Sequence, residues 1–379
     1  MKKSIKQIMF LLLVLILLGG TLVCSGAEED YFVIGISAPF SGTNAVRGKL
    51  ILDGAKLAME QINAEGGING IKIKLVNEDN EGNPTKVVNT VIKLIEQEEV
   101  DVLLVSDSSG TMAAVPVVTE AKIPMFMTAF SPALTEQGSS FVFRCTVSDG
   151  LTGRQAVEYA VDVLGYDKIG IMHSTDSYGK GILEPALEAL KELGKPAVGV
   201  ETFSYQDQDF SSQLLKLNGA GAEAIFVHTY DVPTAIIVKQ IDELGLDMKI
   251  FGSTALASEE FKEMAGKSRE GVKVLVAFIN SNPDPRVQEF VSAFEESFGY
   301  KPDANCARAH AAIMLYAEAL KAAESTDSAK IVEALHNLEN VKLPGGNFTF
   351  DEKGEGLKQN MVGEWKDGEM QFLGLYSGK

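Results

Sequence analysis

The stretch Gln61-Ile62-Asn63-Ala64-Glu65-Gly66-Gly67-Ile68-Asn69-Gly70 ends one helical pattern and precedes a strand pattern. Residues 71–76 after it alternate apolar and polar side chains, which is typical of a strand. Gly66 and Gly67 end the helix, because glycine enters left-handed backbone conformations without steric cost. The apolar residues before the stretch recur at the spacing of one helical face: Ile51, Ala55, Ala58 and Ile62. The stretch therefore predicts a helix that turns tightly into the next strand of a βα unit.

Length and composition bound the class of protein. The chain has 379 residues, of which 45% are hydrophobic and 23% are charged, so we expect two globular domains. Its formal net charge of −18 would repel phosphate backbones, which argues against nucleic acid as a partner.

The N-terminus is predicted to be a targeting segment. Lysines precede an apolar run at 8–18 that is short for a membrane span, and Ser25-Gly26-Ala27 fits a small-residue cleavage site. We therefore predict a signal peptide at 1–27 and a periplasmic or otherwise extracytoplasmic protein. A second interpretation makes Cys24 a lipid-modified N-terminus, although the residues before it match a lipoprotein signal poorly.

Strand patterns alternate with helix patterns along most of the chain, which predicts two doubly wound parallel sheets. The first sheet takes strands near 32–37, 71–76, 102–106, 124–128 and 141–144. The second takes strands near 168–173, 197–203, 224–228, 249–252 and 272–277, with one helix over Lys180–Leu193 between its first two strands. Three helical patterns and a tail of short strands follow, at 286–298, 307–323, 329–338, 346–350, 361–365 and 370–376.

Candidate binding residues follow strands of the first predicted sheet. Ligands of open α/β sheets bind beyond the carboxyl ends of the strands, where helices begin. Ser108 and Ser109 stand at such a helix start, whose free N–H groups suit a carboxylate. The alternative is that these serines only cap the helix. Thr128 and Phe130 follow the next strand, where Thr128 offers a further donor.

The second half offers matching positions. Tyr178, Tyr230 and Thr254 follow three of its strands, and a tyrosine there gives a flat apolar wall with one hydroxyl. Asp231 would accept hydrogen bonds from a ligand ammonium, or it only caps its helix. Arg47, just before the first long helix, would reach a ligand acid group, or it would be a solvated surface residue or pair with Asp107.

Signals of catalysis and metal binding are weak. The sequence lacks a Gly-x-Ser-x-Gly elbow, a phosphate loop and a dinucleotide fingerprint, and its four histidines lack metal-ligand spacing. His173 and His228 end strands, so pairing with a serine is conceivable, but no carboxylate is placed by sequence to orient either ring. We predict no enzyme, no metal and no cofactor. Cys145 and Cys306 either pair, as exported cysteines do, or are small buried side chains.

Several motifs in order resemble one family, the leucine/isoleucine/valine-type periplasmic solute-binding proteins of ABC transporters, which have the type I periplasmic-binding fold. The matching pieces run along nearly the whole chain after residue 27. They are Gly35–Gly42, Ala58–Gly70, Ser131–Thr135, Phe143-Arg144, Tyr178–Gly181 and Phe350–Gly354.

The resemblance implies a clamshell of two lobes joined by a three-segment hinge, with crossings near Cys145–Asp149, Phe278–Pro285 and Val341–Gly346. The expected boundaries are 28–145 with 279–341 for the first lobe, and 146–278 with 342–379 for the second.

The resemblance also implies roles for the site residues. Ser108 matches the serine that holds the ligand carboxylate, and Tyr178 and Tyr230 match aromatic walls. The acidic residue for the ligand ammonium would fall near Thr254, which leaves Asp231 as the nearest substitute. Phe130 replaces a threonine of the family pattern, and Arg47 replaces an aromatic residue. These departures argue against assuming a branched-chain amino acid.

The expected function is delivery of an amino acid or related small carboxylate or amide to an ABC permease by a monomer. Two alternatives remain open: a binding protein that reports its ligand to a membrane signalling partner, and an exported hydrolase.

Overall fold

The computed structural model describes residues 30–42 and 44–378, and residues from Phe32 onward form one compact unit. The predicted signal peptide and Cys24 lie outside the described residues. Within these residues, none of the helices combines the length and the apolar character needed to cross a bilayer.

The first sheet has five strands in the order β2-β1-β3-β4-β5, and β1, β3, β4 and β5 pair in parallel. This order confirms a doubly wound arrangement. The strands are β1 (Tyr31–Ala38), β2 (Lys72–Asp79), β3 (Val102–Val105), β4 (Met125–Met127) and β5 (Val142–Arg144). The helices between them are α2 (Ala45–Ala64), α3 (Pro84–Glu96), α4 (Ser108–Ala121) and η1 (Pro132–Leu134).

The second sheet has seven strands in the order β14-β13-β10-β9-β8-β6-β7, in which β13 runs antiparallel to its two neighbours, β10 and β14, and the remaining pairs are parallel. Its strands are β6 (Ile169–Ser174), β7 (Gly199–Phe203), β8 (Ala224–His228), β9 (Lys249–Gly252), β10 (Lys273–Val276), β13 (Asn360–Lys366) and β14 (Glu369–Tyr376). Its helices are α5 (Asp149–Asp162), α6 (Ser177–Lys180), α7 (Leu183–Glu192), α8 (Ser211–Gly219), α9 (Asp231–Glu243), η2 (Thr254–Ala257), α10 (Glu259–Ala265) and η3 (Gly266–Arg269).

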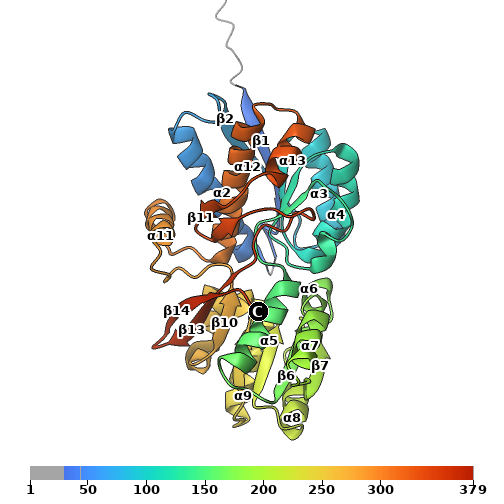
Figure 1. Ribbon diagram of the computed structural model, residues 1–379, viewed down its shortest axis with the longest axis vertical. Helices are drawn as coiled ribbons and strands as arrows, with labels where there is room; N and C mark the ends of the chain where they lie inside the picture. The colour runs from blue at the N-terminus through green and yellow to red at the C-terminus, as the bar shows by residue number, and fades with distance from the viewer. Residues whose placement is uncertain (1–29, 43, 379) are drawn as a thin grey trace, which may run out of the picture. The chain divides into compact units, whose positions relative to one another are not determined.

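The chain returns to the first sheet after β10 and then comes back to the second. Figure 1 shows α12 and α13, in orange and red, beside α2 and the first sheet, whereas β13 and β14 extend the second sheet. A methyl group on Gly54 of α2 would lie 2.2 Å from the carbonyl oxygen of Cys306, so only glycine permits this close approach of α2 and α12. The returning segment comprises α11 (Pro285–Phe298), α12 (Ala304–Ala323), α13 (Ser328–His336), β11 (Val341–Leu343) and β12 (Gly346–Phe348).

The helix stop at Gly66-Gly67 has the predicted form. Both glycines have positive φ, of 97° and 78°, and a methyl group on Gly67 would lie 2.3 Å from the carbonyl oxygen of Ile71. The side chain of Asn63 bonds both the N–H and the carbonyl of Ile73 at 2.8 Å. The end of α2 is thereby fastened to the start of β2.

The structure settles two details of the sequence analysis. The helix predicted over Lys180–Leu193 is α7, which begins three residues later, and the separate short helix α6 precedes it; Pro185 lies in the first turn of α7, where its missing N–H is tolerated. Of the two alternatives for Cys145 and Cys306, the second is confirmed, because both are buried free thiols.

Candidate functional site

A cavity of about 330 Å³ lies where strand ends of both sheets meet α2 and α12. This volume is within the range of small-molecule pockets. It is lined by all the sequence-predicted site residues except Ser109: Arg47, Ser108, Thr128, Phe130, Tyr178, Tyr230, Asp231 and Thr254. The lining therefore draws on residues that lie more than 200 positions apart in the chain.

The first-sheet edge of the pocket is built around the start of α4. The Ser108 hydroxyl oxygen accepts hydrogen bonds at 3.3 Å from the N–H groups of Phe130 and Ser131. Because its oxygen is used as an acceptor, its O–H remains available to donate into the pocket. Asp107 has φ of 67°, an uncommon conformation for a residue other than glycine, and its side chain caps Gly110. This edge presents the Ser108 hydroxyl as a donor for an anionic group, while the Asp107 side chain occupies the N–H of Gly110.

Aromatic rings connect the two sheet edges. The rings of Phe130 and Tyr178 lie 5.7 Å apart between centroids, and those of Tyr178 and Tyr230 lie 5.0 Å apart. The Tyr230 hydroxyl donates to Asp176 at 2.7 Å, which fixes the orientation of its ring. These three rings form a continuous apolar wall that spans the pocket.

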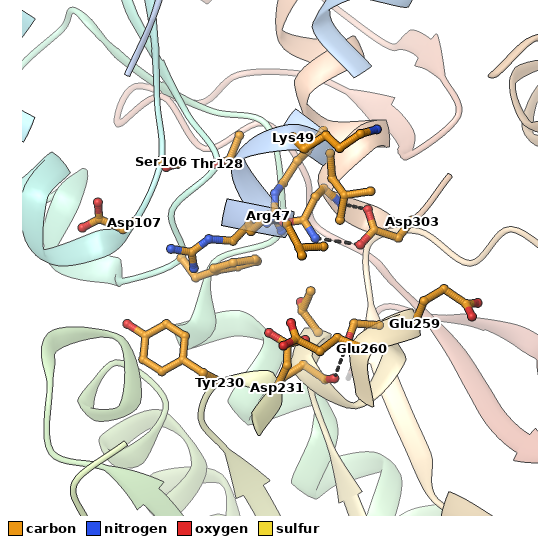
Figure 2. A pocket seen from close by; sticks show the side chains of 18 of the residues that line it. Arg47, Lys49, Ser106, Asp107, Thr128, Tyr230, Asp231, Glu259, Glu260 and Asp303 are labelled. Atoms are coloured by element: carbon orange, nitrogen blue, oxygen red, sulfur yellow. Dashed lines mark hydrogen bonds between the residues drawn. The ribbon is translucent and has the colours of Figure 1, made fainter. Parts of the chain in front are cut away.

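Arg47 lies among carboxylates. Figure 2 shows its side chain extending between Asp107 and Tyr230, and its guanidinium lies 5.8 Å from the centre of the Tyr230 ring. Burial raises the pKa values of Asp107, Asp231 and Glu260, and the positive charge of Arg47 opposes each shift. Among described residues Arg47 forms no ion pair, so the alternative of a direct pair with Asp107 is wrong and only this longer-range attraction connects them.

Arg308 was not identified from the sequence. Its side chain is 5% exposed, and its guanidinium lies 4.7 Å from the centre of the Phe130 ring in the pocket lining. Nη2 donates to Asn305, whereas Nε and Nη1 have no hydrogen-bond partner in the described part of the chain. Burial lowers the pKa of Arg308 to about 10. A lone arginine on an alanine-rich helix was the available signal.

The sequence matches the model of a family described as periplasmic binding protein over residues 32–369. The chain belongs to the periplasmic binding protein family. An amino acid binding protein of Pseudomonas aeruginosa is 32% identical over 341 residues, which cover 88% of this chain and 90% of that protein. The Leu/Ile/Val-binding protein homolog 1 of Brucella suis is 29% identical, over 93% of this chain and 95% of that protein.

Solved structures agree with this membership. The leucine binding protein LivK of Thermotoga maritima superposes with a TM-score of 0.84 at 26% identity, and covers 91% of this chain and 98% of its own. LivJ of Streptococcus pneumoniae, solved with isoleucine, gives a TM-score of 0.82 at 26% identity over 91% of this chain and all of its own. The two-lobed α/β fold predicted from the sequence is thereby confirmed.

The periplasmic binding protein also contains a buried histidine network, in which one of the two strand-end histidines does lie beside a serine. His228 Nδ1 lies 2.6 Å from the Ser253 hydroxyl, and Nε2 lies 3.4 Å from a carboxylate oxygen of Asp149. A carboxylate therefore does face one of the two strand-end histidines. All three side chains are buried and stand outside the pocket lining, beneath the Tyr178 ring, which lies 4.3 Å from the His228 ring. A substrate in the pocket would not meet this serine.

The remaining lining of the binding protein includes charged residues that no strand-end motif marks. Glu259 and Glu260 follow η2, and Asp303 caps α12 through the N–H groups of Asn305 and Cys306. Ser109 is adjacent to Ser108 in the first turn of α4 but does not line the cavity. Within residues 30–42 and 44–378, no cluster of three or more His, Cys, Asp and Glu side chains is arranged to hold a metal ion.

Proposed function

We propose that this protein captures an amino acid or a related small carboxylate or amide outside the cytoplasm and delivers it to an ABC permease. The pocket carries this proposal, because donors for an anion and carboxylates for a cation line one cavity between two sheets. A relative is named an amino acid binding protein, and a related structure was solved with isoleucine.

The proposed roles follow from the chemistry of the lining. Ser108, Thr128 and the start of α4 receive the ligand carboxylate, while Asp231 receives a ligand ammonium. Tyr178 and Tyr230 cover the apolar part of the ligand, as does Phe130. Thr254 offers one hydroxyl from η2, and Arg47 holds the surrounding carboxylates in their charged form.

Ligand binding is proposed to close two lobes, one with residues 28–145 and 279–341 and the other with 146–278 and 342–379. A ligand that touches Ser108 in one lobe and Tyr230 in the other stabilises the closed state over the open one. The alternating sheet membership of the chain supports this hinge, since the returning segment packs on α2 and the tail strands pair with β10.

We also propose export through the signal peptide at 1–27 and action as a monomer. A sensor would use the same pocket, but its closed form would be recognised by a membrane signalling protein instead of a permease. The buried network of His228 is proposed to be structural rather than hydrolytic, because Ser253 stands outside the pocket lining.

Calorimetric titration of the purified protein tests the proposal. The panel contains leucine, glutamate, glutamine, succinate and benzoate, and bound ligand is recovered and analysed after each titration. We expect at least one to bind and to return unchanged, and a ligand at a hundredfold excess over Kd to add about 2.7 kcal/mol to the unfolding free energy. Hydrolysis of the ligand, or the absence of binding heat with every amino acid and carboxylate of the panel, would refute the proposed function. Uptake by vesicles containing the cognate permease separates a transporter from a sensor.

A further inference from the structure

Arg308 is a buried cation without a counter-ion. No carboxylate lies within ion-pair distance of it among described residues, and its one hydrogen-bond acceptor is the neutral amide of Asn305. Nε and Nη1 are buried and unpartnered at the pocket lining. A buried charge is costly unless it is paired and hydrogen-bonded, so this arrangement is complete only with an anion in the pocket.

The nearby carboxylates do not fill this role. Asp303 acts most strongly on Arg308, but its oxygens cap α12 through Asn305 and Cys306 and also accept the Asn305 side-chain amide. The other pocket carboxylates are grouped around Arg47. Arg47 is therefore surrounded by negative charge, whereas Arg308 is not.

Arg308 and Ser108 are two donors that come from different elements of the pocket. The Ser108 hydroxyl is bonded to the backbone N–H of Phe130, whereas the Arg308 guanidinium covers the face of the Phe130 ring. They come from different elements, α4 and α12, and the cavity extends to both. A second acid group would give Arg308 the counter-ion that it lacks while the first is held by Ser108.

We propose that Arg308 binds a second acid group of the ligand, so that the natural ligand is a small molecule with two acid groups joined by a short chain. This inference rests on the proposed function. An acidic amino acid fits the lining best, because Asp231 and Glu260 add negative charge near Arg47 that a ligand ammonium would neutralise. A dicarboxylate shares the second acid group but lacks the ammonium.

The matched probes are L-glutamate and L-glutamine, which have nearly the same shape and differ in the side-chain charge. Calorimetry with the purified protein should give glutamate an affinity roughly tenfold to hundredfold higher than that of glutamine, as expected for hydrogen bonds to a charged group. Succinate and glutarate form the second arm. If either binds more tightly than glutamate, the ligand is a dicarboxylate without an ammonium.

Arg308→Gln should reduce the preference for glutamate over glutamine to within about threefold, while Arg308→Lys should keep part of it. Arg286→Gln is the matched control, because Arg286 lies on α11 and pairs with Asp284 away from the pocket. Near-ultraviolet circular dichroism confirms that each variant is folded.

Three results would overturn the inference, and they differ from failure of the proposed function. Binding of leucine or benzoate by the parent, with glutamate no tighter than glutamine, leaves a binding protein without a second-acid site. Equal weakening of benzoate and glutamate in Arg308→Gln would make Arg308 the receiver of the only carboxylate. Retention of the full preference for glutamate in folded Arg308→Gln would exclude the residue from recognition. If no panel member binds, both proposals fail.

Discussion

Two buried arginines near the pocket have opposite surroundings. Arg144, which is fully buried at the end of β5, places Nε 2.9 and 3.1 Å from the two oxygens of Glu355. It also donates to the backbone carbonyls of Ala129 and Ser131. Arg308, nearly as buried, has one amide acceptor. The arginine that joins segments of the fold, Arg144, has a carboxylate partner within the protein. The arginine that faces the cavity, Arg308, has none among the described residues.

The largest expected effect is on stability when Arg144 loses its charge. Arg144→Met leaves the partly buried carboxylate of Glu355 without its charged partner and removes the donors to the loop at 129–131. Breaking a buried pair in this way costs about 3–5 kcal/mol, which urea denaturation would measure. Lys249→Met, at an exposed pair with Asp247, is the control and should change stability by less than about 1 kcal/mol. Equal effects at the two sites would mean that the network of Arg144 contributes little.

A third buried basic residue, His310, tests whether burial alone determines how much a basic side chain changes the free energy of unfolding. Burial lowers the pKa of His310 from 6.5 to about 4, and His310 Nε2 lies 2.8 Å from the Gln61 amide oxygen. The unfolded chain binds a proton at His310 more readily than the folded chain does. The contribution of neutral His310 to the free energy of unfolding is therefore complete above pH 6.5 and is lost as the pH falls towards 4. The loss amounts to about 3 kcal/mol.

His310→Gln should therefore flatten the unfolding free energy between pH 6.5 and 4 relative to the parent, as measured by denaturation at each pH. Comparison of the two chains removes the contribution of the carboxylates, which titrate in both. An unchanged difference between variant and parent across this range would show that His310 is not held neutral by its surroundings.

Arg308→Met without ligand should behave opposite to Arg144→Met. The lowered pKa of Arg308, from 12.5 to about 10, corresponds to about 3 kcal/mol of unfavourable energy for the charged form at neutral pH. Replacing an uncompensated buried charge by an apolar side chain of similar size should leave the free energy of unfolding unchanged or raise it by about 1–3 kcal/mol. Denaturation of the ligand-free variant measures this. A loss as large as that of Arg144→Met would place Arg308 among the residues that hold the fold together.

The difference between these arginines also explains what the sequence could predict. Strand and helix patterns depend on local spacing, so both sheets and the helix stop at Gly66 were accessible, as were the polar strand ends that carry Ser108 and Tyr230. The partners of a charge depend on contacts between distant segments. Arg308 and Asp303 reach the pocket only because α12 packs along α2, and Asp149 reaches His228 from the start of α5. The spacing of residues along the chain does not indicate these contacts between distant segments.

The smallest expected effect is a change in ligand affinity that differs between two adjacent serines. The comparison shows where the ligand-facing region ends. Ser108 lines the cavity and Ser109 does not, although both lie in the first turn of α4. Ser108→Ala removes a hydroxyl donor to a charged carboxylate and should weaken ligand binding roughly tenfold or more. Ser109→Ala should change the affinity by less than about twofold, since surface substitutions of this kind stay within about 0.5 kcal/mol. Titration of both variants with the tightest ligand of the panel measures the ratio. Similar losses in both would mean that the helix start as a whole, rather than the Ser108 hydroxyl, receives the anion.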